Sequence, residues 1–459
     1  IIAVIMFKLR KFKLPAAALV ALSFFLLICV GTSLLCLPFA TKSGHIDFLT
    51  SLFTATSASC VTGLAVADTA SYWSYYGQVV ILLLIQIGGL GFITIMSLFM
   101  LYVKKHTSLS QRKLVMQSAG SVDLASIKGL VKIILLGTLI FEFAGAFILC
   151  FAFVPVYGWG EGIWQSIFTS VSAFCNAGFT LTDKKEGYYS LVQFMNYPHV
   201  ILTISLLIII GGIGFFVWGD VVHHGIHLKK YSFHSKVVLS TTGVLIVLGW
   251  ALFMAFEWNN PATIGNWGAG TKVMSSLFMA VTPRTAGFAA VDYGSMSGAG
   301  NALTMALMLI GGSPGSTAGG LKTTTLAVFV LATLATAKRE NEVHLYNRRF
   351  ENDASHQAGA IVCLYILVSV ASTMIICAIE GAGIGAGISL DSVAFEVVSA
   401  VGTVGLSQGI TAGLHAVSKV LLVLLMYFGR VGGFTLVLIF SGEKKPVSLS
   451  RVADKIIVG

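Results

Sequence analysis

Long uncharged stretches constrain the fold of this chain more than any other feature of its sequence. Six stretches of 20 to 35 residues contain no Asp, Glu, Lys or Arg: Leu14–Thr41, Thr69–Val103, Gly187–Gly219, Val237–Phe256, Tyr293–Leu321 and Ala354–Ile379. Each is long enough to cross a bilayer as a helix, which takes roughly 20 apolar residues. Only 10 % of the residues are charged, whereas soluble domains carry about 25 %. The sequence therefore predicts an all-α integral membrane protein embedded in the lipid bilayer.

Two further stretches are predicted to span the membrane although each carries a charge near its middle. They are Leu130–Phe153, which contains Glu142, and Ser418–Ser441, which contains Arg430. Basic residues gather on every second connection between the resulting eight spans, at 8–13, 104–132, 229–236, 338–349 and 444–455. Because Lys and Arg accumulate on the cytoplasmic side, both termini are expected in the cytoplasm, and the protein in the cytoplasmic (inner) membrane. Lys184 and Lys185 are the exception on the outer side.

The opposite connections contain apolar segments of about a dozen residues, too short to cross the bilayer. They share a pattern in which a Phe precedes a Gly by ten residues, at Phe53 and Gly63, Phe168 and Gly178, and Phe395 and Gly405. A fourth copy, from Phe278 to Gly287, is one residue shorter. Matched motifs at such intervals indicate internal repeats. Since all four lie on the same side, the repeats are parallel, with pseudo-four-fold symmetry about the membrane normal.

The predicted fold thus has four membrane-pore-membrane repeats, made of eight transmembrane helices and four re-entrant pore half-helices. The repeats are expected at 14–113, 128–230, 234–340 and 354–442, followed by a cytoplasmic C-terminal segment at 443–459. The third repeat has a broken second helix at 311–320.

Four extended loops at membrane depth are tolerated only where their backbone groups line water or ions. Backbone carbonyls can replace the hydration shell of a cation, and Gly allows the backbone geometry this requires. The half-helices would point their negative C-terminal ends toward the same place. A single Gly-Leu or Gly-Phe is an ordinary helix cap, but four at matched positions favour a cation pathway.

Acidic residues recur five positions after the Gly in three repeats, as Asp68, Asp183 and Asp292, whereas the fourth repeat has Ile410. Three carboxylates at one height would form an outer mouth that concentrates cations. Alternatively, each Asp caps its own loop. The two interpretations are compatible.

A Gly-rich segment interrupts the apolar run between Tyr293 and Lys338. It consists of Gly311, Gly312, Ser313, Pro314, Gly315, Ser316, Thr317, Ala318, Gly319 and Gly320. Its spacing misses the nucleotide-binding Gly-x4-Gly-Lys-Ser/Thr pattern by one residue. We expect an intramembrane loop that swings between blocking and clearing the path below the ring of glycines; the alternative is a fixed kink.

Arg430 lies within a predicted span, where a charge is costly unless it faces a pore or a partner. Below the Gly-containing loops it would raise the barrier to cation passage. The alternatives are a salt bridge with Glu142 or capping of the carbonyls of the broken loop. Lys322 is expected to reach cytoplasmic water by snorkelling, as an accessory of the loop.

The sequence resembles the Trk/Ktr/HKT superfamily of potassium transporters, and most closely the KtrB-type ion-translocating membrane subunit. The resemblance rests on the Gly-rich segment, on Arg430 and on the four Gly motifs with the residue that follows each, Leu64, Phe179, Phe288 and Leu406. The motifs are Cys60, Val61, Thr62 and Gly63; Cys175, Asn176, Ala177 and Gly178; Arg284, Thr285, Ala286 and Gly287; and Gly402, Thr403, Val404 and Gly405.

The resemblance implies that these four motifs form a K⁺ selectivity filter and that the Gly-rich segment and Arg430 form a gate. It also implies K⁺ as the transported ion, because Gly63 stands where sodium-selective plant relatives carry Ser. A homodimer, a cytoplasmic nucleotide-binding regulatory ring of the KtrA type and Na⁺ as an activator are further implications, although no sodium site can be named.

Other function classes fit less well. The net charge of +10 is explained by the cytoplasmic connections, so no nucleic-acid partner is expected. His223, His224, His227 and His234 lie on a basic connection and favour a solvated face over a metal site. No catalytic constellation is visible, so no enzyme is expected. The alternative is a sodium-coupled transporter of a small solute, although such folds usually show inverted repeats.

Overall fold

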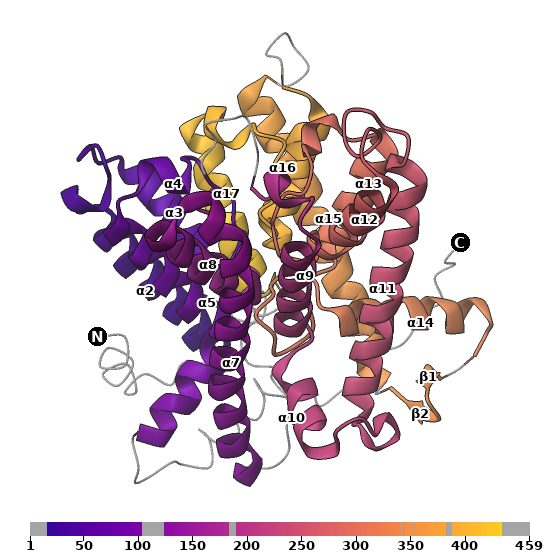
Figure 1. The fold of residues 1–459 in the computed structure, drawn as a ribbon. Coiled ribbons are helices and arrows are strands. Elements are labelled where there is room, and N and C mark those ends of the chain that lie inside the picture. The colour runs from indigo at the N-terminus through magenta and orange to yellow at the C-terminus, as the bar shows by residue number, and fades with distance from the viewer. Residues whose placement is uncertain are drawn as a thin grey trace, which may run out of the picture.

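The computed structural model describes residues 16–102, 124–182, 190–340, 342–350, 352–381 and 388–433 of the 459-residue chain. Helices make up nearly all of the regular structure in this part, together with one two-stranded hairpin (Figure 1). The helical class expected from the sequence is confirmed. The predicted C-terminal segment at 443–459 lies outside the described residues.

Four helices form the outer layer and correspond to the first predicted span of each repeat. They are α2 (Ala16–Leu35), α7 (Leu124–Tyr157), α11 (Phe233–Glu257) and α15 (Asn352–Glu380). Long aromatic side chains on α7, among them Phe143 and Phe147, are about two-thirds exposed. Exposed rings of this kind on an apolar helix are suited to contact with lipid rather than water.

Four short helices of 12 to 16 residues lie inside this layer, as expected for the connections too short to cross a membrane. These half-helices are α3 (Phe48–Ser59), α8 (Trp159–Phe174), α12 (Ala269–Val281) and α16 (Leu390–Gly402). The shared Phe of the sequence pattern is completely buried in all four. Asp47 caps the start of α3, and the Thr50 hydroxyl, which donates to it at 2.5 Å, holds the pKa of that carboxyl below its ordinary value.

The inner helix that follows each half-helix is either broken or ends at a glycine within the described residues. These inner helices are α5 (Tyr75–Tyr102), the pair α9 (Pro198–Gly212) and α10 (Phe215–His224), the pair α13 (Gly298–Leu309) and α14 (Thr323–Ala337), and α17 (Ala416–Val431). The α9–α10 pair bends by 96°. The sequence predicts a break only between α13 and α14, so the expectation of continuous spans at 69–103 and 187–219 is wrong.

The physical reason for the extra breaks is a glycine with positive φ, which is found at each break and at the end of α17. Gly91, Gly214, Gly315 and Gly432 have φ of 69°, 93°, 69° and 91°, and helical backbone requires negative φ. The nearly identical runs Gly-Gly-Leu-Gly-Phe at 88–92 and Gly-Gly-Ile-Gly-Phe at 211–215 carry this signal in the sequence.

Short elements complete the described chain. They are η1 (Pro38–Ala40), α4 (Thr69–Tyr72), η3 (Val192–Phe194), η4 (Leu228–Lys230), η5 (Tyr293–Ser295), η6 (Thr411–Gly413), β1 (His344–Leu345) and β2 (Arg348–Arg349). The antiparallel β1–β2 hairpin pairs His344 with Arg349 and lies at the opposite end of the molecule from the half-helices (Figure 1). The segment η4, which contains the basic residues Lys229 and Lys230, lies toward this end as well (Figure 1).

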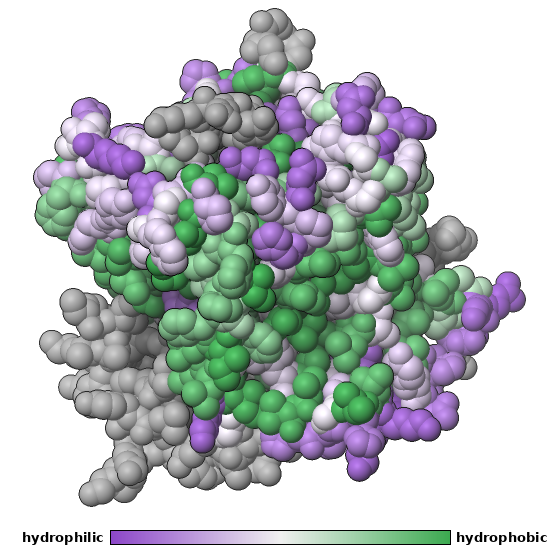
Figure 2. All heavy atoms as spheres, viewed as in Figure 1, coloured by the Kyte–Doolittle hydropathy of each residue, from purple (hydrophilic) through white to green (hydrophobic). Residues whose placement is uncertain are grey.

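The surface and the helix lengths fit a multi-pass membrane protein. Figure 2 shows apolar residues gathered in a band across the middle of the visible face, with hydrophilic residues concentrated toward the upper edge and the lower right. Within the described residues, three helices are long and apolar enough to cross a membrane, at Val131–Tyr157, Phe233–Glu257 and Asp353–Glu380, and the bent pair α9–α10 makes a fourth. The remaining inner helices are shorter because they are broken.

Helix contacts follow a cyclic order. The inner helix α5 contacts half-helix α8, α9 contacts α12, α13 contacts α16, and α17 contacts α3. Each inner helix therefore packs on the half-helix that comes next in the chain, and the last packs on the first. The cycle closes around a common centre, toward which all four half-helices end.

Two buried glutamates join outer helices to inner ones. Glu257, at the end of α11, accepts hydrogen bonds from the backbone N–H and hydroxyl of Ser297, the residue that caps α13, and from Asn260 and Thr263. Glu380, at the end of α15, accepts the backbone N–H of His415, which caps α17. Each carboxylate thus fixes the start of an inner helix.

Candidate functional site

Four segments, which we call the ring segments, follow directly on the half-helices. They are Cys60–Gly63, Cys175–Gly178, Arg284–Gly287 and Gly402–Gly405. The second residue of each has positive φ: 55° at Val61, 60° at Asn176, 70° at Thr285 and 52° at Thr403. Positive φ is uncommon outside glycine and costs about 1–3 kcal/mol. Its recurrence at one position in four segments indicates a single turn built four times.

The last glycine of each ring segment lies against the next segment. A Cβ atom added to Gly63 would be 2.5 Å from the carbonyl oxygen of Ala177, and one on Gly178 would be 2.8 Å from that of Ala286. The same construction places Gly287 at 2.2 Å from the Val404 oxygen, and Gly405 at 2.2 Å from the Thr62 oxygen. No side chain fits at any of these positions. Four glycines and four carbonyl groups therefore form one closed ring.

Backbone hydrogen bonds tie each ring segment to its own half-helix. The N–H groups of Thr62, Ala177 and Val404 donate to the carbonyl oxygens of Ser57, Ser172 and Ser399 at 2.7–2.9 Å. In the third segment, which is one residue shorter, the Ala286 N–H donates to the Thr282 oxygen at 2.9 Å. The shorter third segment thus keeps the equivalent hydrogen bond, with one residue fewer between donor and acceptor.

Hydroxyl groups add a second tie in two of the four segments. The Ser57 hydroxyl accepts the N–H of Gly63, and the Ser399 hydroxyl accepts that of Gly405, both at 3.0 Å. The corresponding hydroxyl of Ser172 is buried and has no hydrogen-bond partner in the described part of the chain. The first and fourth segments are therefore held more firmly than the second.

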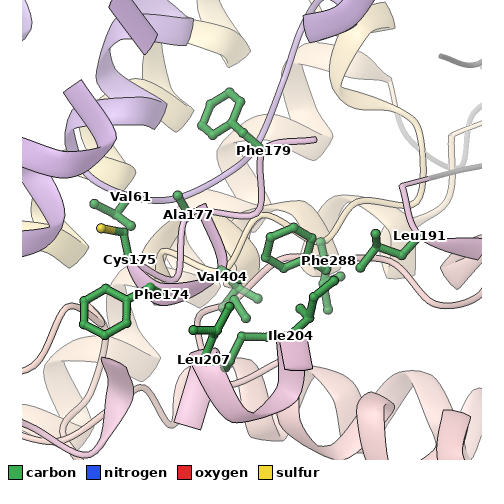
Figure 3. Packing of buried hydrophobic residues seen from close by; sticks show 14 of the residues in the cluster. Val61, Phe174, Cys175, Ala177, Phe179, Leu191, Ile204, Leu207, Phe288 and Val404 are labelled. Carbon is green, nitrogen blue, oxygen red and sulfur yellow. The ribbon is translucent and has the colours of Figure 1, made fainter. Parts of the chain in front are cut away.

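The apolar side chains of the ring segments pack into the core. Val61, Cys175, Ala177 and Val404 belong to one buried cluster, which also contains Ile204 and Leu207 of α9 (Figure 3). Two polar side chains differ: within the described residues, the hydroxyls of Thr62 and Thr403 are buried without a hydrogen-bond partner. Native proteins rarely leave such oxygens unpaired, so these are oxygens suited to a bound ion or water.

A cavity of about 200 Å³, which we call the outer cavity, opens above the ring. The four ring glycines line its base, and the segments that follow them line its walls. Asp68 and Asp292 lie in these walls, while Asp183 is outside the described residues. Asp68 accepts hydrogen bonds from Ser71, and Asp292 accepts them from Gly294 and Ser295. Both aspartates thus cap their own loops and still face the cavity.

The Gly-rich loop, residues Gly311–Gly320, packs on the other side of the ring. The Thr317 N–H donates to the Gly211 carbonyl at 3.3 Å, and its hydroxyl donates to the carbonyl of Phe174 at the end of α8, also at 3.3 Å. A Cβ on Gly319 would lie 2.1 Å from the Thr403 hydroxyl oxygen. The loop therefore contacts two of the four half-helix ends or ring segments directly.

Arg430 connects this loop to the first inner helix. Its guanidinium donates to the carbonyl oxygens of Thr317 in the loop and of Gly88 and Gly89 in α5. Among the described residues no acidic side chain lies within ion-pair distance of it. Of the alternatives the sequence leaves open, capping of loop carbonyls is the one observed.

Glu142 does not pair with Arg430, and Lys322 bonds to loop carbonyls. The Glu142 carboxylate accepts the side-chain N–H of Gln86 at 3.2 Å and lies 4.0 Å from the Cys175 sulfur. The Lys322 ammonium donates to the carbonyls of Ala318 and Gly319 at 2.9 and 3.3 Å. The sequence predicts that Lys322 reaches cytoplasmic water, whereas its ammonium bonds to carbonyls of the buried loop, which are closer acceptors.

Sequence reasoning missed one charged residue near the ring. Glu396, on half-helix α16, is 1 % exposed and accepts hydrogen bonds from Ser407 and Thr411, both of which line the outer cavity. The available signal was its position directly after the shared Phe, where the other half-helices have Thr54, Thr169 and Met279.

Comparison with known proteins identifies a family and several relatives of this chain. A sequence profile of the TrkH family, described as "Cation transport protein", matches residues 11–448. The chain is 40 % identical to the potassium/sodium uptake protein NtpJ of Enterococcus hirae, over 98 % of this chain and 99 % of that protein. It is 37 % identical to the Ktr system potassium uptake protein B of Bacillus subtilis, covering 95 % and 94 %, and 33 % identical to that of Vibrio alginolyticus, covering 98 % and 97 %.

The fold also has a counterpart of known structure. The crystal structure of the potassium transporter TrkH from Vibrio parahaemolyticus superposes with a TM-score of 0.71 at 19 % identity, covering 94 % of this chain and 86 % of that one. Identity this low supports the fold alone. Together with the family match over nearly the whole chain, these findings identify a transporter rather than an enzyme: the chain belongs to the TrkH family of cation transport proteins, as a member of its KtrB type.

Proposed function

We propose that this protein takes up potassium ions across the cytoplasmic membrane, with the four ring segments as its selectivity filter. The observation that carries the proposal is the closed ring in which each glycine meets the carbonyl of the next segment. Carbonyl oxygens arranged around a common centre can replace the hydration shell of a monovalent cation. The names of the relatives, which are potassium or potassium/sodium uptake proteins, support the same ion.

The surroundings of the ring favour cations over anions. All four half-helices end beside the ring segments, and the C-terminal end of a helix carries a partial negative charge. The unpartnered hydroxyls of Thr62 and Thr403 add oxygen ligands. Asp68 and Asp292 place negative charge in the outer cavity, where it raises the local concentration of cations.

The proposed architecture is four membrane-pore-membrane repeats, at 14–113, 128–230, 234–340 and 354–442, with both termini in the cytoplasm. Support comes from the four equal turns of the ring segments and from the cyclic helix contacts. In this arrangement the outer cavity faces the outside, and the basic β1–β2 hairpin faces the cytoplasm.

The Gly-rich loop is proposed as the gate, with Arg430 and Lys322 as the residues that hold it. Its contacts with Thr403 and with the end of α8 support this proposal. Hydrogen bonds from Arg430 and Lys322 to loop carbonyls would hold a closed position, and their loss would release the loop. The positive charge of Arg430 would also oppose cation passage.

The proposed assembly is a homodimer with one pathway per protomer, regulated by a cytoplasmic nucleotide-binding ring of the KtrA type. Support comes from likeness to proteins named as parts of a Ktr system and from the basic cytoplasmic connections. Na⁺ is proposed as an activator. The membrane potential would drive uptake with ~2.3 kcal/mol per charge per 100 mV.

The test is uptake of rubidium and sodium into potassium-depleted cells or liposomes that carry the unchanged protein, Gly63→Ser or Gly405→Ser. Gly44→Ser is the matched control, because Gly44 also has positive φ but a Cβ there would meet nothing within 4 Å. We expect the unchanged protein and the control to favour rubidium, and both ring variants to lose that preference.

Two results would contradict the proposal. If no cation flux is found, or if flux is indifferent to both ring glycines, the ring is not a filter. The alternative, a sodium-coupled transporter of a small solute, would then become the leading hypothesis.

A further inference from the structure

The walls of the outer cavity are not alike on its four sides. Asp68 and Asp292 supply carboxylates after the first and third ring segments, but the fourth segment has Ile410 at the same position. A carboxylate is nevertheless present on this side. Glu396, on half-helix α16, supplies this carboxylate. Glu396 is 1 % exposed, so the carboxylate is buried behind the wall, whereas Asp292 is an exposed residue.

The Glu396 carboxylate is fully engaged by groups of the cavity wall. The Ser407 hydroxyl donates to one of its oxygens, and the Thr411 hydroxyl donates to the other at 3.0 Å. The backbone N–H of Gln408 donates to it as well. These three donors all belong to residues that line the outer cavity.

This arrangement determines whether the two hydroxyls present hydrogens or lone pairs to the cavity. A hydroxyl has one hydrogen and two lone pairs. Since the hydrogens of Ser407 and Thr411 point back to Glu396, their remaining lone pairs are left for the other side. Ser407 accepts the Gly409 N–H at 2.8 Å, and its oxygen lies 3.1 Å from the Thr411 hydroxyl oxygen. With both hydrogens directed to Glu396, a cation beside these two oxygens can contact both. Hydroxyls polarised by a carboxylate are acceptors, and so are suited to a cation.

We propose that Ser407 and Thr411, oriented by Glu396 behind them, form a binding site for a monovalent cation in the outer cavity, at the entrance to the ring. The inference rests on the proposed function and adds the place where the ion is captured. Glu396 is a positioning residue, because it acts through the two hydroxyls and does not line the cavity itself. It also supplies the negative charge that Ile410 does not.

The experiment measures initial rates of rubidium uptake against external rubidium concentration. Glu396→Gln removes the charge and keeps the shape, and Glu396→Asp keeps the charge. The matched control is Glu380→Gln, which changes the other buried glutamate at the outer end of the fourth repeat, where the carboxylate accepts the His415 N–H and does not border the cavity.

We expect Glu396→Gln to raise the KM for rubidium about tenfold, the low end of the effect of charged clefts on ion capture, with a maximal rate within about twofold of the unchanged protein. Glu396→Asp should recover most of the affinity, and Glu380→Gln should leave the KM unchanged. Thr411→Val, which removes one oxygen and keeps the carboxylate, should raise the KM in the same direction.

The inference is overturned if Glu396→Gln keeps the original KM, or if Glu396→Asp and Glu380→Gln impair uptake as much as Glu396→Gln does. If Glu396→Gln does not reach the membrane, Thr411→Val decides, and an unchanged KM there has the same meaning. Absence of rubidium uptake by the unchanged protein would instead contradict the proposed function.

Discussion

The guanidinium of Arg430 donates a hydrogen bond to the carbonyl oxygen of Thr317, which lies 113 positions earlier in the chain. This bond joins the last described helix to the middle of the Gly-rich loop, and further bonds continue it to Gly88 and Gly89 of α5. A single side chain thus holds together three parts of the chain around the lower side of the ring.

Loss of this link should open the proposed pathway. We expect Arg430→Gln to raise the initial rate of rubidium uptake into liposomes about tenfold, because hydrogen bonds to charged groups contribute about 1.5–3 kcal/mol each and the barrier from the positive charge disappears. Arg349→Gln is the control, since Arg349 pairs with Glu342 on the exposed hairpin. An equal or lower rate in Arg430→Gln at normal protein levels would argue against a holding role.

Contact between the Gly-rich loop and the ring can be tested by adding one methyl group. In Gly319→Ala the new Cβ would collide with the Thr403 hydroxyl at 2.1 Å. Overpacking of this kind costs about 1–3 kcal/mol, so the packed position of the loop should be depopulated and rubidium uptake should rise at least about fivefold. Gly359→Ala is the control, because nothing lies within 4 Å of a Cβ there. A fixed kink would instead show lower protein yield without faster uptake.

The serines beneath the ring provide a comparison within one molecule. Ser57→Ala and Ser399→Ala each remove a hydrogen bond to the N–H of a ring glycine, worth about 0.5–1.5 kcal/mol. We expect both to reduce the preference for rubidium over sodium, measured as the ratio of uptake rates. Ser172→Ala, at the equivalent position without a partner, should leave this ratio unchanged. Equal effects of all three would show that the hydroxyls matter only for packing.

Stability should depend on the glutamate between α11 and α13. Glu257→Ala leaves Ser297, Asn260 and Thr263 without their shared acceptor, a carboxylate that is fully buried. Buried donors without a partner cost about 1–3 kcal/mol each, so the detergent-solubilised protein should unfold at a clearly lower temperature, as followed by size-exclusion chromatography after heating. Glu340→Gln, on an exposed residue, is the control and should unfold with the unchanged protein.

Much of the architecture was predictable because the membrane limits the choices. Uncharged stretches longer than 20 residues have few structures other than helices available in lipid. The outer helices α7, α11 and α15 accordingly begin within about six residues of the predicted span starts, and the half-helices α3, α8, α12 and α16 contain the recurrent Phe. The ring glycines were found because their spacing repeats, and repetition is visible without any knowledge of contacts.

Other features were not predictable from the same reasoning. The breaks at Gly91 and Gly214 lie inside uncharged runs that read as continuous spans, since hydropathy does not register a single positive φ. The partners of Arg430 are backbone carbonyls, which have no signature in the amino-acid sequence. Glu396 can be noticed in the sequence as a charge on a half-helix, but its partners Ser407 and Thr411 are visible only in the structure.

The sequence by itself determined that the protein lies in a lipid membrane, how many matched motifs it has and which residue types each motif contains. Hydrophobicity and periodicity are properties of the chain alone. The tertiary structure decided which atoms meet. The glycine of one ring segment touches the carbonyl of the next only because the four half-helices pack in a closed cycle. Contacts between residues more than a hundred positions apart depend on that closure, and no local pattern encodes them.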